Sequence, residues 1–283
     1  MSSQQSHKDT LISTACWIAA VRARESERAD HLFNDPWAAR LAGEEGPAWR
    51  ERTTGGKDEN EVGLAIRTRF FDDFLLYVTR EHAVHQVVIA AAGMDTRAFR
   101  LAWPSETRLF ELDLPQIFVR KEHVLSVAKA VPACQRRVVG IDLSDGSWVD
   151  AVQQAGFNPD QRTVWLLEGL LFYLQGSVVT RLFEAITALS VGGSWLGCEL
   201  KNTEMLTSPQ TRSWIELLAR EGAPWISSID HPETFFAGCG WRATVVQPGE
   251  EGAHFGRWPF PVVPRSVPGV PRTFFVTAIR RPS

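Results

Sequence analysis

The sequence predicts a doubly wound α/β fold, in which helices cover both faces of a mostly parallel sheet. From residue 86 onward, short apolar segments alternate with longer segments of helical periodicity, a pattern typical of strand–helix–strand units with right-handed crossovers. The apolar segments are continuous, as expected for strands that are buried on both faces of a parallel sheet. The expected strands in this part are residues 87–91, 107–112, 137–141, 163–167 and 194–199, with the main helices at 115–129 and 177–190.

The segment before the sheet is expected to be helical. Apolar residues recur at helical spacing over much of residues 11–80. A polar, glycine-containing stretch at 50–63 is expected to form a loop, and residues 65–79 then resume the helical pattern. We therefore expect residues 1–80 to form an N-terminal helical cap and residues 81–283 to form the core domain.

The alternation breaks after the fifth expected strand. Residues 201–230 are mixed in character and mainly helical, which suits a lid at about 201–235 inserted before the last strands. The remaining elements are expected to be a helix at 232–238, a strand at 241–247, a glycine- and proline-rich loop at 249–271 and a strand at 273–280. The sheet would then contain seven strands.

Composition and charge argue against several classes of partner. A net charge of −3 gives no broad attraction to nucleic acid or to acidic membranes. No apolar run approaches the roughly 20 residues needed to cross a bilayer, and the first ten residues lack the apolar core of a signal peptide. The four cysteines are far apart and match no zinc spacing, so we expect reduced thiols and no metal site. These observations predict a cytoplasmic protein and leave its oligomeric state open.

Glycine or acidic residues follow four consecutive expected strands. Gly93 follows the first strand, Asp113 the second, Asp142 the third and Glu168 the fourth. In an open α/β sheet, ligands bind at the carboxyl ends of the strands. The 20 residues from Gly93 to Asp113 match the separation at which nucleotide-binding units place an acid on a ribose. The alternative role for Asp113 is to cap the helix that follows it.

The missing part of the glycine pattern indicates which nucleotide binds. Residues 91–96 never complete the G-x-G-x-x-G pattern that lets a pyrophosphate approach the backbone. S-adenosylmethionine contains an adenosine and two cationic groups but no pyrophosphate. The acidic strand ends therefore favour S-adenosylmethionine over a nicotinamide dinucleotide.

Several ordered motifs resemble those of the leucine carboxyl methyltransferase family, in particular its bacterial branch of polyketide and related O-methyltransferases. The matching motifs span about residues 11 to 242 and are specific as an ordered set. They are Arg22-Ala23-Arg24-Glu25, Phe33-Asn34-Asp35-Pro36, residues 67–74, residues 92–101, residues 110–115, Asp142-Leu143, residues 168–174 and Gly240-Trp241. The resemblance implies a class I methyltransferase sheet that binds S-adenosylmethionine.

The resemblance also implies roles for five residues. Arg67 would grip the cofactor carboxylate with its planar guanidinium, and Asp113 would hold the ribose hydroxyls. Asp142 would accept from the adenine amine beside the backbone of Leu143, and Glu168 would lie near the methionine ammonium. Structural ion pairing is the alternative role for Arg67 and Glu168.

The loop after the first strand departs from the family pattern. The family reads Gly-Ala-Gly where this chain has Ala91-Ala92-Gly93. Gly93 and Ala91 would both border the cofactor, and the methyl group of Ala91 would either fit there or crowd the methionine moiety.

The methyl acceptor is less well defined by the sequence. The family resemblance indicates a small-molecule oxygen, either a carboxylate or a phenol, in natural-product biosynthesis. We expect an aromatic acceptor, because the lid contains Trp214 and Trp225 and indole faces stack on flat rings; the alternative is that these tryptophans only pack. Tyr173, His254 and Arg257 are the candidate acceptor-binding or catalytic residues. The alternative function, motivated by Ala91, is a catalytically silent S-adenosylmethionine-binding partner or regulator of a biosynthetic complex.

Overall fold

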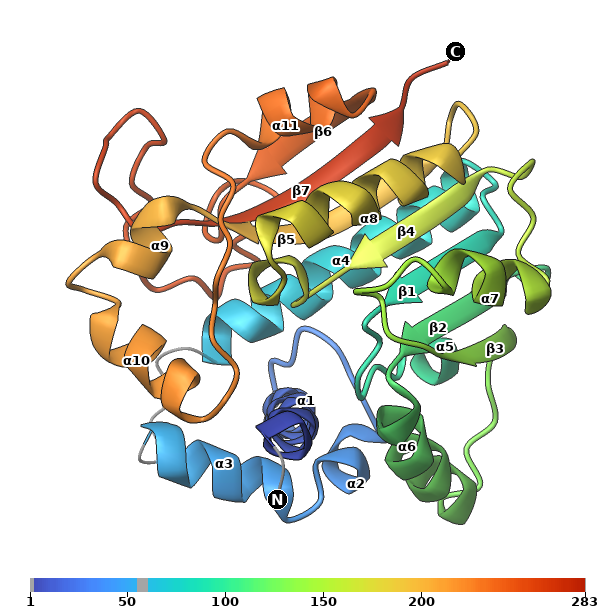
Figure 1. Ribbon diagram of the computed structural model, residues 1–283. Coiled ribbons are helices and arrows are strands. Elements are labelled where there is room, and N and C mark those ends of the chain that lie inside the picture. Colours follow the sequence, from blue (N-terminus) through green and yellow to red (C-terminus); the bar gives the residue numbers. More distant parts are fainter. Residues whose placement is uncertain (1–2, 55–60, 283) are drawn as a thin grey trace.

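The computed structural model describes residues 3–54 and 61–282, with side chains described from residue 12 to 53 and from 61 to 282. A seven-stranded sheet has the order β3-β2-β1-β4-β5-β7-β6 (Figure 1). The strands are β1 (Gln86–Ala90), β2 (Arg108–Asp113), β3 (Gln135–Gly140), β4 (Thr163–Leu167), β5 (Trp195–Lys201), β6 (Trp241–Val246) and β7 (Thr273–Arg280). Neighbouring strands are parallel except that β7 runs antiparallel to both β5 and β6. The strand order reverses between β1 and β4, where ligands of such sheets bind.

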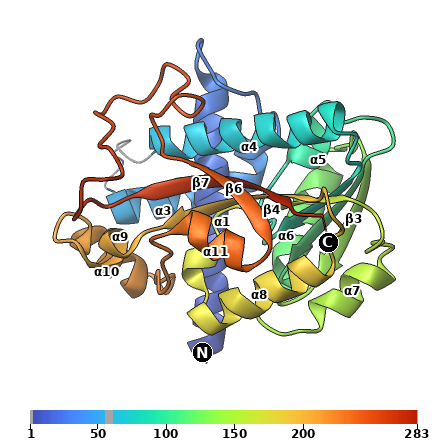
Figure 2. The ribbon, with the colours of Figure 1, turned by 90° about the horizontal axis from the view of Figure 1, so that it is seen from above.

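The helices form a layer on each face of this sheet (Figure 2). All helices of the described residues, in order along the chain, are α1 (Ser3–Glu27), α2 (Ala38–Ala42), α3 (Glu45–Thr54), α4 (Glu61–Glu81), α5 (Arg97–Arg100), α6 (Pro115–Val127), α7 (Trp148–Gln154), the 3-10 helix η1 (Leu171–Tyr173), α8 (Gly176–Ala188), α9 (Thr203–Thr207), α10 (Arg212–Arg220) and α11 (Pro232–Gly238). These elements confirm the predicted doubly wound α/β class.

Alternation along each buried strand supplies two hydrophobic cores. Val87 and Ile89 of β1 pack with α4 and α5 on one face, whereas Val88 and Ala90 pack with α7, α8 and α11 on the other. Successive side chains of a strand point to opposite faces, so one apolar segment serves both cores. This two-sided burial explains why β1 is apolar throughout.

Helix α4 is part of the core that contains Val87 and Ile89. Its apolar residues, among them Phe71 and Phe74, are buried in the same core as strands β1, β2 and β4. Both ends of the expected loop at 50–63 are helical, since α3 continues to Thr54 and α4 begins at Glu61; residues 55–60 lie outside the described part. The division into a cap of residues 1–80 and a core of 81–283 stays a prediction.

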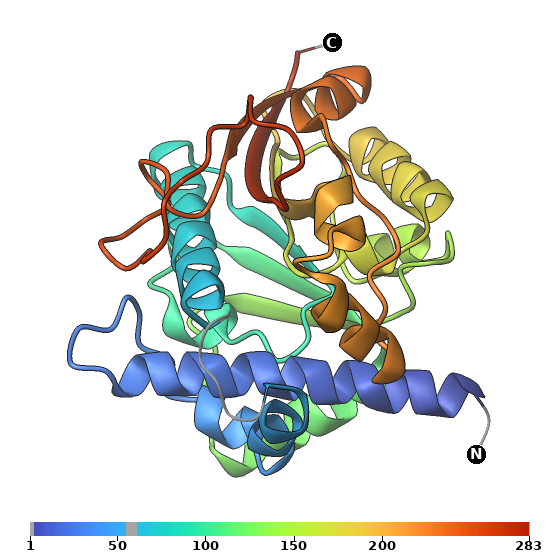
Figure 3. The ribbon, with the colours of Figure 1, turned by 90° about the vertical axis from the view of Figure 1, so that its left-hand side faces the viewer.

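The long helix α1 runs along the carboxyl ends of the strands, with α2 and α3 beside it (Figure 3). Its Arg22 Nη2 donates to the carbonyl of Met94, in the loop that follows β1, at 2.5 Å. Trp17 of α1, Trp49 of α3 and Trp214 of α10 form a ring cluster with centroids 4.5–6.3 Å apart. Helix α10, which lies in the segment expected to form a lid, is thereby joined to α1 and α3. In the described part of the chain, no helix is both long and apolar enough to span a membrane.

Candidate active site

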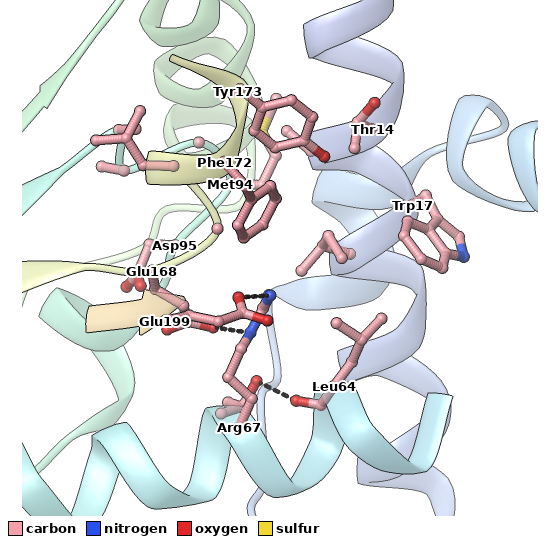
Figure 4. Close-up of a pocket in the computed structure, with 18 of the residues that line it drawn as sticks. Thr14, Trp17, Leu64, Arg67, Met94, Asp95, Glu168, Phe172, Tyr173 and Glu199 are labelled. Carbon is pink, nitrogen blue, oxygen red and sulfur yellow. Dashed lines mark hydrogen bonds and ion pairs between the residues drawn. The ribbon is translucent and has the colours of Figure 1, made fainter. Parts of the chain in front are cut away.

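A cavity of about 940 Å³ lies at the carboxyl ends of the strands. It is lined by the ends of β1, β2, β4 and β5, by the residues that follow β3, by α1, α4 and α10, and by residues around Trp258. Figure 4 shows side chains from α1, α4 and the strand ends converging on it. The predicted residues Arg67, Ala91, Gly93 and Glu168 all line it, as do Asp113, Asp142, Leu143 and Tyr173.

The carboxylate of Asp113 is held in place by backbone donors. Its Oδ2 accepts from the Gly93 amide at 2.6 Å and its Oδ1 accepts from the Leu114 amide at 2.7 Å. Burial nevertheless raises the pKa of Asp113, because it outweighs these two N–H donors. A ligand that donates further hydrogen bonds would stabilise the charged carboxylate. The N-cap residue of α6 is Leu114 and not Asp113, and α6 has no side-chain cap hydrogen bond. The alternative role of Asp113 as the cap of this helix is therefore not what the structure shows, and its carboxylate is available for a ligand.

The loop after β1 uses left-handed backbone conformations. Ala91 has φ 56° and Gly93 has φ 47°. An alanine in this region carries a steric cost that glycine avoids. Ala91 also lines the cavity. The departure from the family pattern is thus a position where the backbone favours glycine.

The third strand supplies a polar turn at the cavity edge. Asp142 Oδ1 accepts from the Ser144 amide at 2.8 Å, which fixes the turn after β3. Leu143, between them, is buried and lines the cavity together with Asp142. A carboxylate beside an apolar side chain suits an adenine, which has one amine edge and two apolar faces.

Arg67 links two acids at the ends of neighbouring strands (Figure 4). Its Nε lies 2.7 Å from Glu168 Oε1, and its Nη1 lies 2.6 Å from Glu199 Oε2. Burial alone would raise the pKa of Glu199, but the Arg67 and Lys201 cations outweigh it and lower that pKa to about 2. Arg67 therefore fixes β4 and β5 to α4 at the floor of the cavity.

A second arginine continues this ionic network beneath the loop after β1. Arg97 lies 2.8 Å from Glu168, 2.5 Å from Asp95 and 2.7 Å from Asp72. Asp72 also binds Arg100 at 2.6 Å. Burial would raise the pKa of Asp95, yet the surrounding cations lower it to about 2. Glu168 is thus paired with two arginines. The structural ion pairing that was the alternative role for Arg67 and Glu168 is therefore present.

Aromatic rings form the opposite part of the cavity wall. Phe172 lies 4.8 Å from Tyr173 and 4.8 Å from Trp225, centroid to centroid, and Trp225 lies 6.5 Å from Trp214. All four residues line the cavity. The two lid tryptophans therefore both pack against neighbouring rings and border the cavity. Figure 4 shows the Tyr173 ring extending toward α1, with its hydroxyl near Thr14.

The structure places two candidate acceptor residues outside the cavity lining. The Nη2 of Arg257 lies 2.8 Å from Glu25, and its Nη1 donates to the Asp30 carbonyl at 2.7 Å. The exposed His254 accepts from the Gly256 amide within its own loop. Arg257 therefore links the loop at 249–271, the late loop, to the end of α1. The structure gives neither Arg257 nor His254 a role at the cavity. Arg69, the neighbour of Arg67, pairs with Asp73 on the surface.

The sequence reasoning did not single out Glu199 and Lys201 as site residues. Lys201 Nζ lies 2.7 Å from Glu199 Oε1, and both residues line the cavity. They are two residues apart at the end of β5 and so project from the same face. The sequence feature that could have identified them is an acid and a lysine two residues apart at the end of an apolar strand.

Comparison with known proteins agrees with the geometry of the cavity. The family model of leucine carboxyl methyltransferase matches residues 15–187. A candidate S-adenosyl-L-methionine-dependent methyltransferase from Mycolicibacterium gilvum (strain PYR-GCK) is 39% identical over 256 residues, which cover 82% of this chain and 83% of that protein. A second, from Mycobacteroides abscessus, is 35% identical and covers 94% of both chains.

Solved structures show the same fold. The crystal structure of a candidate methyltransferase from Thermobifida fusca YX superposes with a TM-score of 0.61 at 16% identity, covering 92% of this chain and 94% of that one. The sheet order, the cavity at its switch point and the relatives lead to one identification. The chain belongs to the leucine carboxyl methyltransferase family and is an S-adenosylmethionine-dependent methyltransferase.

Proposed function

We propose that the protein methylates an oxygen of a small aromatic molecule, either a carboxylate or a phenol, in natural-product biosynthesis. One observation carries this proposal: the acidic strand ends and a wall of aromatic rings line the same cavity. The acidic part suits the cofactor and the aromatic part suits a flat acceptor. The place in natural-product chemistry rests on the resemblance of the motifs to that bacterial branch.

The residues of the acidic part fit the cofactor. The charge-destabilised carboxylate of Asp113 would accept from the ribose hydroxyls, while Asp142 and Leu143 would border the adenine. Arg67 and Glu168 would lie at the methionine end. When bound, S-adenosylmethionine would supply the methyl group: an acceptor oxygen would bond to the methyl carbon as the C–S bond breaks, and S-adenosylhomocysteine would leave with that electron pair. The protein's contribution is to align the acceptor and exclude water.

The cavity lining favours an acceptor that needs little help to lose a proton. Among the described residues, no histidine lines the cavity. Burial raises the pKa of Tyr173, so its hydroxyl stays protonated and can donate a hydrogen bond to the acceptor rather than remove a proton. A carboxylate is already ionised at neutral pH, since its reference pKa is about 4.

The test is transfer of isotopically labelled methyl groups from S-adenosylmethionine to a panel of aromatic acids, phenols and peptides with a free C-terminus. We expect label in the aromatic acids or phenols, identified by mass spectrometry. Label confined to the peptide C-terminus would overturn the small-molecule proposal.

A second candidate function is a catalytically silent cofactor-binding partner or regulator of a biosynthetic complex. The left-handed Ala91, which lines the cavity, motivates it. Binding of S-adenosylhomocysteine without transfer to any acceptor of the panel would favour this candidate.

A further inference from the structure

Lys201 is a buried cation at the end of β5 that borders the cavity. Its Nζ lies 2.7 Å from Glu199 Oε1 and donates to Thr273 Oγ1 at 2.7 Å. The same nitrogen lies 5.3 Å from the ring centroid of Phe172 and 5.0 Å from that of Trp225. An ammonium has three N–H donors, and the two oxygens account for two of them. The third faces aromatic rings and the cavity.

The position of Lys201 in the sheet assigns it to the acceptor. The cofactor residues follow β1, β2, β3 and β4, which form one side of the sheet. Lys201 ends β5, and Thr273 begins the neighbouring strand β7, both on the far side of β4. The rings of Phe172 and Trp225 that border its ammonium belong to the aromatic wall.

Lys201 is less fully neutralised than the arginines at the floor of the cavity. Arg67 contacts two carboxylates and Arg97 contacts three. Among the described residues, the only carboxylate that pairs with Lys201 is Glu199, which it shares with Arg67. Burial lowers the pKa of Lys201 despite the attraction of Glu199. Aromatic faces attract a cation but do not neutralise it, so an anion at this position would be stabilised.

We propose that the acceptor is an aromatic carboxylic acid whose carboxylate binds the Lys201 ammonium while its ring packs against Phe172 and Trp225. This inference rests on the proposed function and narrows its acceptor to one chemical class. Lys201 is then a substrate-binding residue that determines specificity for acids over phenols and amides.

The chemistry of this arrangement balances without a base. One carboxylate oxygen pairs with Lys201, and the other forms the new bond to the methyl carbon as the S–CH₃ bond breaks. No proton is transferred, because the carboxylate is already ionised. The product is a neutral ester, which loses its ion pair with Lys201. We therefore expect the ester to bind more weakly than the acid, which favours product release.

The wild-type protein provides a test that does not depend on a variant. Benzoate and benzamide have nearly the same shape, but only benzoate is an anion. In calorimetric titrations with saturating S-adenosylhomocysteine, benzoate should bind about ten- to a hundredfold more tightly than benzamide, as expected for a charge-assisted hydrogen bond. Equal affinities, or binding of benzamide alone, would overturn the inference.

The variant test uses Lys201→Met, with the exposed Lys129→Met as a matched control. Lys201→Met should raise the KM for an aromatic acid by about ten- to a hundredfold. It should leave the affinity for S-adenosylhomocysteine within about twofold of the wild type, because Lys201 lies on the acceptor side. The control should change neither. If Lys201→Met fails to fold, Lys201→Arg retains the charge and should still prefer benzoate to benzamide.

The outcomes separate the inference from the function on which it rests. If the wild type methylates phenols but no acid, the inference fails and the proposed O-methyltransferase function stands. If no small molecule is methylated, the proposed function itself fails. If acids are methylated and Lys201→Met keeps the wild-type KM, the anchor is not Lys201 and the inference is overturned.

Discussion

The two parts of the cavity are built by different kinds of interaction. The part that we propose for the cofactor, the cofactor part, is polar and tightly cross-linked: Arg67 and Arg97 together contact Glu168, Glu199, Asp95 and Asp72. The acceptor part is mainly aromatic and is assembled from η1, α10 and the segment after α10. Ionic networks fix geometry because every partner must be satisfied, whereas ring packing tolerates changes of shape.

This difference suggests how a family can keep one cofactor and vary its acceptor. A change in the ionic part leaves buried charges unpaired, which is costly. A change in the aromatic part alters the shape of the pocket at lower cost. The first part is therefore suited to a constant ligand and the second to a variable one.

The largest expected effect is on the ionic network. Arg97→Met leaves Asp72, Asp95 and Glu168 each without one cationic partner, so we expect a loss of about 3–5 kcal/mol in the free energy of unfolding. Arg52→Met, which removes an exposed pair with Glu45, should cost about 0–1 kcal/mol. Urea denaturation measures both. Equal losses would show that the buried network contributes no more than a surface pair.

The second effect concerns cofactor affinity. Asp113→Asn keeps the shape of the side chain but removes its charge, so binding of S-adenosylhomocysteine should weaken by about 1–3 kcal/mol. Asp145→Asn, an exposed aspartate that also accepts a backbone hydrogen bond, is the control and should bind normally. Calorimetry decides the matter, and an unchanged Kd for Asp113→Asn would remove that residue from the ribose site.

A smaller effect should be confined to the acceptor. Tyr173→Phe removes one hydroxyl from the aromatic wall, so the acceptor KM should rise by a factor corresponding to about 1 kcal/mol, with the Kd for S-adenosylhomocysteine unchanged. The chain's other tyrosine, the exposed Tyr77, provides the matched control Tyr77→Phe. Steady-state kinetics would contradict the assignment if both variants behaved alike.

The smallest effect is expected at the loop after β1. Ala91→Gly relieves a left-handed alanine and should raise stability by about 1 kcal/mol. Ala83→Gly, also left-handed at φ 50° but away from this cavity, should give a similar gain. Only Ala91→Gly should also tighten cofactor binding if the methyl group crowds the site. Identical affinities in both variants would show that Ala91 accommodates the cofactor.

The residues that the sequence assigned to the cofactor all line the cavity, whereas only one of the three residues that it offered for the acceptor does. The interval from Gly93 to Asp113 is local to one strand–helix–strand unit, and the fold brings the two residues into a direct hydrogen bond. Arg67 was assigned from its motif, although its pairing with Glu199 spans 132 positions and could not be read from spacing.

The acceptor part depends on how distant segments fold together. Arg257 had the charge to hold an acid, but the late loop places it on Glu25 at the end of α1. Lys201 was treated only as the start of a lid, because nothing in its neighbourhood shows that Thr273 and Trp225 would enclose it. Tertiary contacts of this kind have no local signature.

Hydrogen exchange on the wild-type protein tests the division of the cavity most directly. S-adenosylhomocysteine alone should slow exchange at the cofactor segments 61–75, 91–95, 111–114 and 141–144. Adding an aromatic acid that the enzyme methylates should then slow exchange at the acceptor segments 171–174, 201–203 and 212–226. This sequential protection is the result that two adjoining sites in one cavity predict. Protection of the same segments by both ligands, or protection by the acid only outside the acceptor segments, would contradict it.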